Sequence, residues 1–377
     1  MSSQYPERKR KTEVIASNVL KNAERAVFAL RSLYKKNGYL PFKMSRFEEY
    51  DLYVKNKEFL LSDRVITFND TDGRLLAMKP DVTLSIIKNN VYEKGVKQKV
   101  CYNENVYRVS AKTGRFSEIM QSGLECIGDT DIFDLYEVIY LAAKSLSLAS
   151  ENFVLDLSHL GILSKLVECA SQDRGFAKEI TKFIAEKNTH EAKALLEKYS
   201  VSEEYRELII SVISMYGSAR DVLPKLEPIC KKIGAEAAFS ELKLICEMLK
   251  NSPFADNIRL DFSVVNDMRY YNGIVFRGFL EGICEGVLSG GEYSALMKKM
   301  GKKAGALGFA MYLDLLDELP EEKRGEDVDV LLLYDENSGI DEVLGIKSDL
   351  IAKGYSVSLQ REIPSDLRYG KICDLRK

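Results

Sequence analysis

The chain has 377 residues, of which 46% are apolar and 29% charged, and its formal net charge is -3. This length suits two or three domains with hydrophobic cores, and the near-neutral charge excludes a strong overall attraction to nucleic acid. No apolar run approaches the roughly 18–20 residues of a membrane-spanning helix, and no signal peptide is recognised, so we expect a cytoplasmic protein.

The N-terminal part predicts a helix followed by short strands. Apolar residues recur at helical spacing over 12–36, and the pattern ends at Asn37-Gly38, a helix stop signal. Residues 39–54 are expected to be an extended segment that leads into a short helix. Alternating runs around a turn predict a β-hairpin with strands at 64–68 and 75–78.

Longer elements follow. Residues 82–91 are predicted to be helical, 99–109 and 117–128 to pair as antiparallel strands, and 131–149 to form an amphipathic helix. A strand is predicted next, then an almost wholly helical stretch, three further strands and a last helix. In chain order these are 152–156, 158–249, 258–264, 274–277, 286–288 and 309–318.

A polar linker over 319–325 precedes a βαβ-like unit, which we expect to be shorter than a normal α/β domain. Its predicted elements are a strand at 328–334, a helix at 340–353 and a strand at 355–359. We therefore expect four parts: a first part of a core at 1–157, a helical lobe at 158–250, a second part of the core at 251–320 and the small unit at 326–377.

The cysteines and histidines argue against metal or covalent chemistry. The seven cysteines are scattered and contain no C-x-x-C pair, which is typical of reduced thiols. The two histidines, His159 and His190, are too few for a histidine-based metal cluster. We expect no cofactor and no metal. The one basic cluster, residues 8–11, is interpreted as a solvated terminus, with an RNA-binding arm as the alternative.

Two segments resemble the histidyl-tRNA synthetase family. Residues 76–128 contain LAMKPDVTLSIIKNN and VCYNENVYRVSAKTGRFSEIMQSGLECIG, and residues 268–296 read MRYYNGIVFRGFLEGICEGVLSGGEYSAL. The resemblance covers roughly residues 12–318. It implies an α+β fold of the class II aminoacyl-tRNA synthetase type, with an antiparallel sheet flanked by helices. It also implies a helical insertion and a short C-terminal unit similar to a truncated anticodon-binding domain.

The resemblance implies a histidine pocket built from seven residues. Asp81 and Thr83, in a segment that matches Arg-Pro-Glu-Gly-Thr of the family, would meet the α-amino group, since a desolvated ammonium needs a carboxylate and a hydroxyl acceptor. Arg108 would bind the α-carboxylate, for which a guanidinium fork is suited. Gln121 and Glu125, four residues apart on one strand face, would surround the ammonium.

Tyr271 and Tyr293 complete the set and would flank the imidazole. Structural roles are the alternatives: Tyr270 and Tyr271 as an aromatic core pair, and Glu125 with Arg108 as an ion pair in a half-buried sheet. The occurrence of all seven matches in order favours the pocket.

The ATP-binding side chains of the synthetases are absent from this sequence. Activation of an amino acid needs cations at the α-phosphate, but Leu315, Ser117 and Asn266 stand where the family has arginines, while Arg115 is retained. Tyr312 replaces a glycine that lets a nucleotide approach the backbone. We therefore do not expect a functioning synthetase.

The resemblance is greatest to the regulatory subunits of ATP phosphoribosyltransferase, which are non-catalytic paralogues of histidyl-tRNA synthetase in histidine biosynthesis. It implies that a short-form catalytic subunit requires this chain for activity, and that L-histidine acts through it as a feedback effector. It also implies a homodimer, formed through about residues 39–53, within a hetero-oligomer. The alternatives are a divergent ligase that activates histidine with ATP and a histidine-responsive protein acting on RNA or a kinase.

Overall fold

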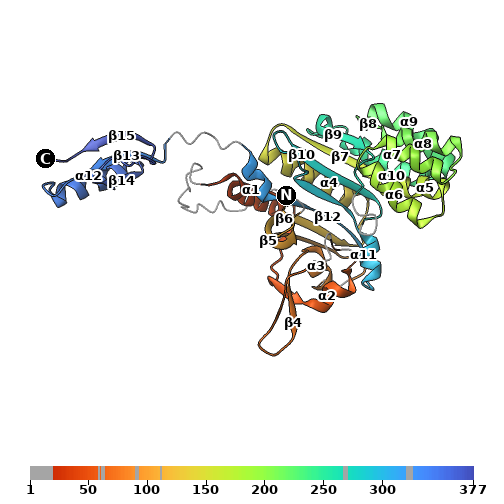
Figure 1. The fold of residues 1–377 in the computed structure, drawn as a ribbon, viewed down its shortest axis with the longest axis horizontal. Helices are drawn as coiled ribbons and strands as arrows, with labels where there is room; N and C mark the ends of the chain where they lie inside the picture. Colours follow the sequence, from red (N-terminus) through yellow and green to blue (C-terminus); the bar gives the residue numbers. More distant parts are fainter. Residues whose placement is uncertain are drawn as a thin grey trace, which may run out of the picture. The chain divides into compact units, whose positions relative to one another are not determined.

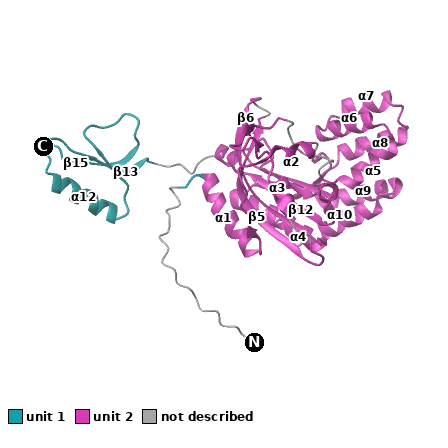
Figure 2. Ribbon diagram, turned by 90° about the horizontal axis from the view of Figure 1, so that it is seen from below, with its two compact units in different colours: residues 1–21, 320–377 teal, residues 22–319 magenta. Residues whose placement is uncertain are grey.

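The computed structural model describes residues 20–57, 60, 64–89, 93–110, 113–265, 271–319 and 326–377. The chain forms two compact units (Figure 2). The large unit is Asn22–Leu319, and the described part of the small unit consists mainly of residues 326–377. Among the described residues, every helix is too short or too polar to span a bilayer.

The large unit is built on a nine-stranded sheet (Figure 1). Neighbouring strands are antiparallel except for the parallel pairs β1–β5 and β7–β9, so the sheet is mixed, whereas an antiparallel one was expected. The α+β class is confirmed. In sheet order the strands are β1 (Leu40–Pro41), β5 (Lys97–Val109), β6 (Phe116–Gly128), β12 (Gly305–Tyr312), β11 (Leu288–Glu292), β10 (Ile274–Leu280), β7 (Phe153–His159), β9 (Ile258–Asp261) and β8 (Tyr216–Gly217).

The two faces of this sheet carry different elements. Helices α1 (Asn22–Lys36) and α4 (Ile132–Ala149) cover one face and share a buried core with the sheet. Predominantly apolar side chains from α2, α3 and α11 form a second buried cluster on the other face. The elements on that side are α2 (Tyr50–Lys55), α3 (Thr83–Asn89), α11 (Ser294–Lys299) and a small sheet of β2 (Phe47–Glu49), β4 (Leu75–Met78) and β3 (Thr67–Asn69).

The stretch predicted to be almost wholly helical contains six helices, and its buried apolar side chains belong to the same cluster as those of α4. It begins at Leu160 and not at 158, because β7 extends to His159 to pair with Ile274 of β10. The predicted division into four parts otherwise remains a prediction. The lobe helices are α5 (Leu160–Ala170), α6 (Arg174–Ala185), α7 (Thr189–Lys198), α8 (Glu203–Ile213), α9 (Ala219–Ile233) and α10 (Glu236–Leu249), followed by the 3-10 helix η3 (Ala255–Asn257).

The prediction of a helix over 309–318 was wrong for its first turn. Phe309–Tyr312 belong to β12, and only Leu313–Glu318 forms a 3-10 helix, η4. β12 lies between β6 and β11 and is buried on both faces, so it lacks the alternation of a half-buried strand. A continuous apolar run of this kind cannot be assigned to strand or helix from periodicity. The helix predicted from residue 12 begins at Asn22 within the described residues.

The small unit has a parallel three-stranded sheet in the order β14-β13-β15. The predicted strand–helix–strand is confirmed with small shifts as β13 (Val328–Leu333), α12 (Ile340–Ala352) and β14 (Val357–Gln360). A third strand, β15 (Tyr369–Asp374), was not predicted, because its short sequence has little alternation or apolar character.

A capping box defines the start of α4. The Asp131 side chain accepts hydrogen bonds from the backbone N–H groups of Phe133 and Asp134, and the Asp134 carboxylate accepts one from the N–H of Asp131. We expect Asp131→Ala to lower the free energy of unfolding by about 1 kcal/mol in urea titrations. Ser202→Ala is the control, because Ser202 precedes α8 without a side-chain cap bond. Equal losses in the two variants would contradict the assignment.

Candidate functional site

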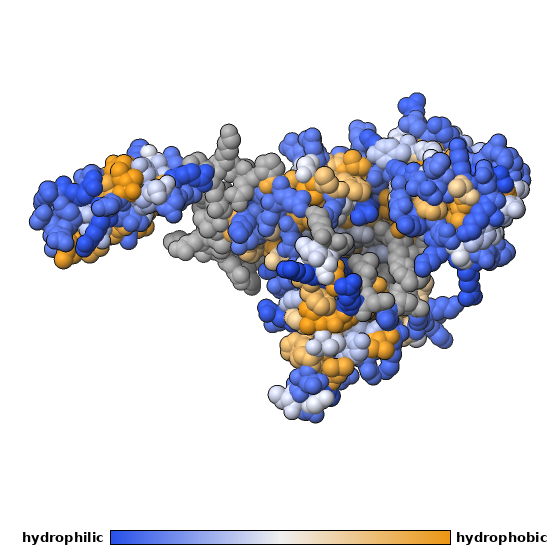
Figure 3. All heavy atoms as spheres, viewed as in Figure 1, coloured by the Kyte–Doolittle hydropathy of each residue, from blue (hydrophilic) through white to orange (hydrophobic). Residues whose placement is uncertain are grey.

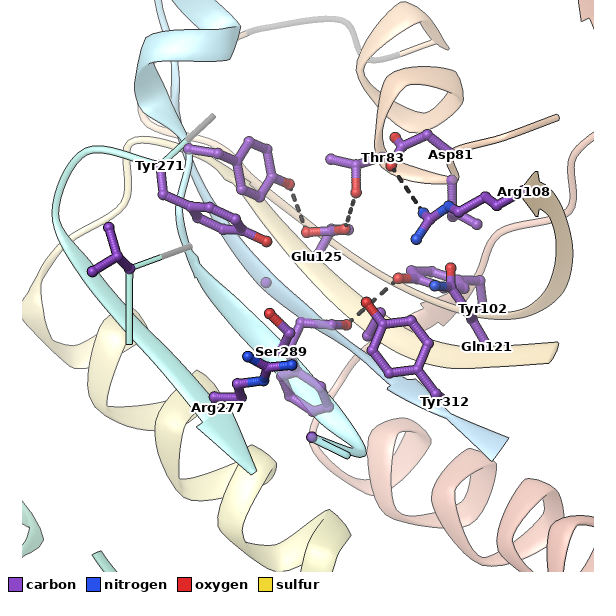
Figure 4. A pocket seen from close by; sticks show the side chains of 17 residues that line it. Asp81, Thr83, Tyr102, Arg108, Gln121, Glu125, Tyr271, Arg277, Ser289 and Tyr312 are labelled. Atoms are coloured by element: carbon purple, nitrogen blue, oxygen red, sulfur yellow. Dashed lines mark hydrogen bonds and ion pairs between the residues drawn. The ribbon is translucent and has the colours of Figure 1, made fainter. Parts of the chain in front are cut away.

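A cavity of about 330 Å³ lies on the sheet face opposite α1 and α4 (Figure 4). The sheet supplies its floor, and the segment that begins α3 supplies one wall. All seven residues of the predicted pocket line this cavity, although they come from positions far apart in the chain. They are Asp81, Thr83, Arg108, Gln121, Glu125, Tyr271 and Tyr293.

Strand register explains the shape of the floor. One row of residues runs across β10, β11, β12, β6 and β5, and its three central members have small side chains or none. Large polar side chains therefore stand at the two ends of the row, and the Tyr102 ring extends over Gly123 to bring its hydroxyl within 3.5 Å of the Phe309 carbonyl. The row is Arg277, Ser289, Ala310, Gly123 and Tyr102.

Glu125 is the central acidic group of the cavity. Its side chain is only 2% exposed, and it accepts hydrogen bonds from Thr83 Oγ1 at 2.8 Å and from the Tyr293 hydroxyl at 2.6 Å. Burial raises the pKa of Glu125 to about 8, against the opposing effect of these two donors; the nearby carboxylate of Asp81 adds to the increase. This carboxyl therefore holds a proton at neutral pH, and an entering cation could displace it.

Asp81 and Arg108 form a second polar group on the α3 side. Asp81 Oδ1 accepts a hydrogen bond from the N–H of Leu84 at 2.8 Å, and its Oδ2 lies 3.5 Å from Arg108 Nη2. Arg108 Nε donates to the carbonyl of Pro80 at 2.6 Å. Burial raises the pKa of Asp81, and the charge of Arg108 opposes this shift. The alternative pairing of Arg108 with Glu125 is wrong, since Arg108 pairs with Asp81.

The remaining predicted residues close the cavity. Gln121 is buried on β6 and lies opposite Tyr312 of β12. Tyr293 is buried immediately before α11 and donates a hydrogen bond from its hydroxyl to Glu125. Tyr271 lines the cavity and also packs against both apolar clusters, so the core interpretation and the pocket interpretation both describe it. Tyr270 lies outside the described residues.

Several lining residues were not predicted, and Tyr102, Arg277 and Ser289 are the polar ones. Tyr102 lies six residues before Arg108 on a predicted strand, so the even spacing could have placed both on one face. Arg277 and Ser289 could not be found in this way, because their position depends on the cross-strand register of β10 and β11.

The structure gives positions for two of the three residues that replace ATP-binding arginines. Leu315 lies in η4 and packs against the main apolar core, and Ser117 lies on β6. Tyr312 lines the cavity, so its ring takes up space that a glycine would leave open. Asn266 lies outside the described residues. Among the described residues, no cluster of three or more His, Cys, Asp or Glu side chains could hold a metal ion.

The protonation of Glu125 predicts a pH dependence of stability. With a pKa near 8, against an ordinary 4.5, the folded chain keeps a proton that the unfolded chain has lost between these pH values. This carboxyl therefore lowers the free energy of unfolding as pH rises, by about 1.4 kcal/mol per pH unit. We expect urea titrations from pH 5 to 8 to show this slope in the wild type relative to Glu125→Gln. Parallel profiles of the two proteins would refute the assignment.

Comparisons with known proteins agree with this geometry. The family model described as histidyl-tRNA synthetase matches residues 15–316. The chain is 30% identical over 301 residues to the ATP phosphoribosyltransferase regulatory subunit of Clostridium kluyveri, covering 76% of this chain and 74% of the relative. A protein of the same name from Clostridium botulinum is 28% identical, with 76% and 69% covered.

Solved structures show the same fold. A protein from Bacillus halodurans, described as an ATP phosphoribosyltransferase regulatory subunit/histidyl-tRNA synthetase, superimposes with a TM-score of 0.74 at 22% identity, covering 98% of both chains. A chain of the ATP phosphoribosyl transferase (HisG:HisZ) complex from Thermotoga maritima gives 0.60 at 19% identity, covering 76% of this chain and 96% of that one.

Proposed function

This chain belongs to the histidyl-tRNA synthetase family and, within it, to the ATP phosphoribosyltransferase regulatory subunits, and on this premise we propose that it regulates the first step of histidine biosynthesis. It acts on a short-form catalytic subunit that needs it for activity. Histidine, bound in the cavity, lowers the activity of the assembly. The observation that carries this proposal is one cavity that gathers all seven residues of the predicted histidine pocket, in a chain whose sequence lacks three of the ATP-binding arginines of the synthetases.

The cavity suits an amino acid with a cationic group. Glu125 and Asp81 are buried carboxyl groups, and the hydroxyls of Thr83 and Tyr293 surround Glu125. An ammonium or imidazolium group can take the proton's place on Glu125, since a buried charge is stable only when it is paired. Inhibition then requires that histidine bind the active and inactive assemblies with different affinity.

We propose that the chain supplies no catalytic group itself. Leu315, Ser117 and Asn266 leave the synthetase-like site without three of its cations, and Tyr312 occupies part of the cavity. Electrostatic stabilisation at the α-phosphate is the main requirement of amino-acid activation, so its loss favours a binding role.

The assembly is proposed to be a homodimer within a hetero-oligomer in the cytoplasm. Exposed apolar side chains gather on the lower part of the large unit in Figure 3, around the small β2–β4–β3 sheet. Leu40 and Phe47, within the predicted dimer segment, are 68% and 46% exposed. Contiguous exposed apolar surface commonly marks an interface. The seven free cysteines fit a reducing compartment.

The test is ATP phosphoribosyltransferase activity of the cognate catalytic subunit, measured with and without this chain across a histidine titration. Activity that requires the chain and falls with histidine is expected. Histidine-dependent ATP–pyrophosphate exchange by the chain alone should be absent. Detectable exchange would favour the divergent ligase, and a catalytic subunit indifferent to the chain would refute the regulatory role.

A further inference from the structure

The charged groups that line the cavity are unequally partnered. Asp81 pairs with Arg108, which also donates to the Pro80 carbonyl, and Glu125 accepts two hydroxyl donors. Within the described part of the chain, the Arg277 side chain makes no hydrogen bond and no ion pair, although it lines the same cavity. Among the described lining residues, Arg277 therefore presents an exposed guanidinium that has no protein carboxylate as counter-ion.

Arg277 is an exposed residue of β10 that lines the cavity. It belongs to the floor row described above, and Figure 4 shows its guanidinium extending toward Ser289 on the cavity side. Its other cross-strand neighbour is Asp156 of β7, yet the two side chains form no ion pair. The charges that act on the Asp156 carboxyl are those of Asp261, Lys187 and Arg259.

Two neighbours hold the guanidinium without neutralising it. Its Cζ lies 5.7 Å from the centroid of the Phe279 ring, which is a cation–π distance. Gly286 lies beside it, and a Cβ at that position would overlap the Arg277 side chain. The absence of a side chain at 286 therefore gives the guanidinium its place at the cavity wall.

We infer that Arg277 forms an anion subsite on the β10 side of the cavity, where it binds a carboxylate or phosphate group of the ligand. The guanidinium presents a planar fork of N–H donors, which matches the two oxygens of either group. Asp81 and the Pro80 carbonyl already occupy part of the Arg108 guanidinium. Of the two arginines that line the cavity among the described residues, Arg277 therefore has more N–H donors available for a ligand.

The spacing of the floor supports a ligand that carries both charges. Arg277 and Glu125 lie on strands three positions apart in the sheet, and Glu125 is level with Val275, two residues before Arg277. Together these offsets separate their Cα atoms by roughly 16 Å. Ser289 and Ala310 have small side chains and keep the floor low next to Arg277, whereas the Tyr102 ring covers Gly123. A ligand with its cationic end at Glu125 can place an anionic end at Arg277, in place of the contact between carboxylate and Arg108 that the family resemblance implies. The subsite therefore deepens, and rests on, the proposed histidine-binding function.

Titration calorimetry of the full chain tests the subsite with three probes. L-histidine carries the carboxylate, L-histidinamide replaces it with a neutral group of similar size, and inorganic phosphate supplies a separate anion. We expect Arg277→Gln to weaken histidine binding about 10- to 100-fold and to leave histidinamide binding unchanged. Arg277→Lys, which keeps the charge but not the fork, should weaken histidine binding less.

The outcomes distinguish whether Arg277 binds the carboxylate of histidine or a separate phosphate. If Arg277→Gln spares histidine but abolishes phosphate binding seen in the wild type, the subsite holds a separate phosphate. If Arg277→Gln weakens the binding of histidine and of histidinamide equally, or changes the binding of none of the probes, the inference is overturned and the proposed function stands. If the wild type binds none of the probes, both are overturned. Arg220→Gln, which removes an exposed arginine of α9, is the matched control and should change nothing.

Discussion

Replacing Glu125 with glutamine is expected to make the assembled ATP phosphoribosyltransferase insensitive to histidine while preserving its activation by this chain. Glu125 is the buried acid between Thr83 and Tyr293, and glutamine keeps its size but cannot become an anion. Loss of a charge-assisted hydrogen bond should raise the half-inhibitory histidine concentration about 10- to 100-fold. Initial rates of the complex across a histidine titration measure this.

The same measurement at several pH values gives an independent check. A cation that pairs with Glu125 must displace the proton of its carboxyl group, because the pKa of Glu125 is about 8. If the cation is the α-ammonium, the apparent affinity for histidine should rise toward pH 8 in the wild type, by at most about tenfold per pH unit, and this rise should be absent in Glu125→Gln. If it is the imidazolium, the rise should stop near about pH 6.5, where that group loses its own proton.

Glu118→Gln is the matched control for both experiments. Glu118 lies on the same strand but is exposed, and it accepts hydrogen bonds from Asn105 and Tyr107 outside the cavity. This variant should respond to histidine as the wild type does. Undiminished inhibition of the Glu125→Gln complex would show that the cavity is not the effector site.

Gly308→Ala is expected to damage both the cavity and the fold. Gly308 lies opposite Glu125 in the β12–β6 pair, and a Cβ at 308 would overlap the Glu125 carboxylate and the Leu124 carbonyl. One of these contacts is with backbone, so the strands must move apart. We expect a loss of about 1–3 kcal/mol in the free energy of unfolding and a loss of histidine binding, measured by urea titration and calorimetry.

The control is Gly345→Ala in α12, where a Cβ would meet nothing within 4 Å. This substitution exchanges a poor helix former for the best one, so it should leave stability unchanged or raise it by up to about 1 kcal/mol. A Gly308→Ala protein as stable as the Gly345→Ala protein would show that the sheet has room at this position.

Elements with a regular pattern were predicted well from the sequence. The long strands β5 and β6 and the helix α4 are confirmed nearly to the residue, because each is bounded by strong turn or capping signals. The second half of β12 was mistaken for the start of a helix, and β15 was missed. Their identity depends on neighbouring strands, and local sequence does not contain that information.

The sequence by itself determined the candidate pocket: seven residues matched in order to one family, and all seven line one cavity. Their role in binding histidine remains a prediction. Only the tertiary structure decided that Arg108 pairs with Asp81, and that Arg277 faces the cavity without a counter-ion among the described residues. The physical reason is that pairing and burial arise from strand register, which brings together side chains distant in the chain.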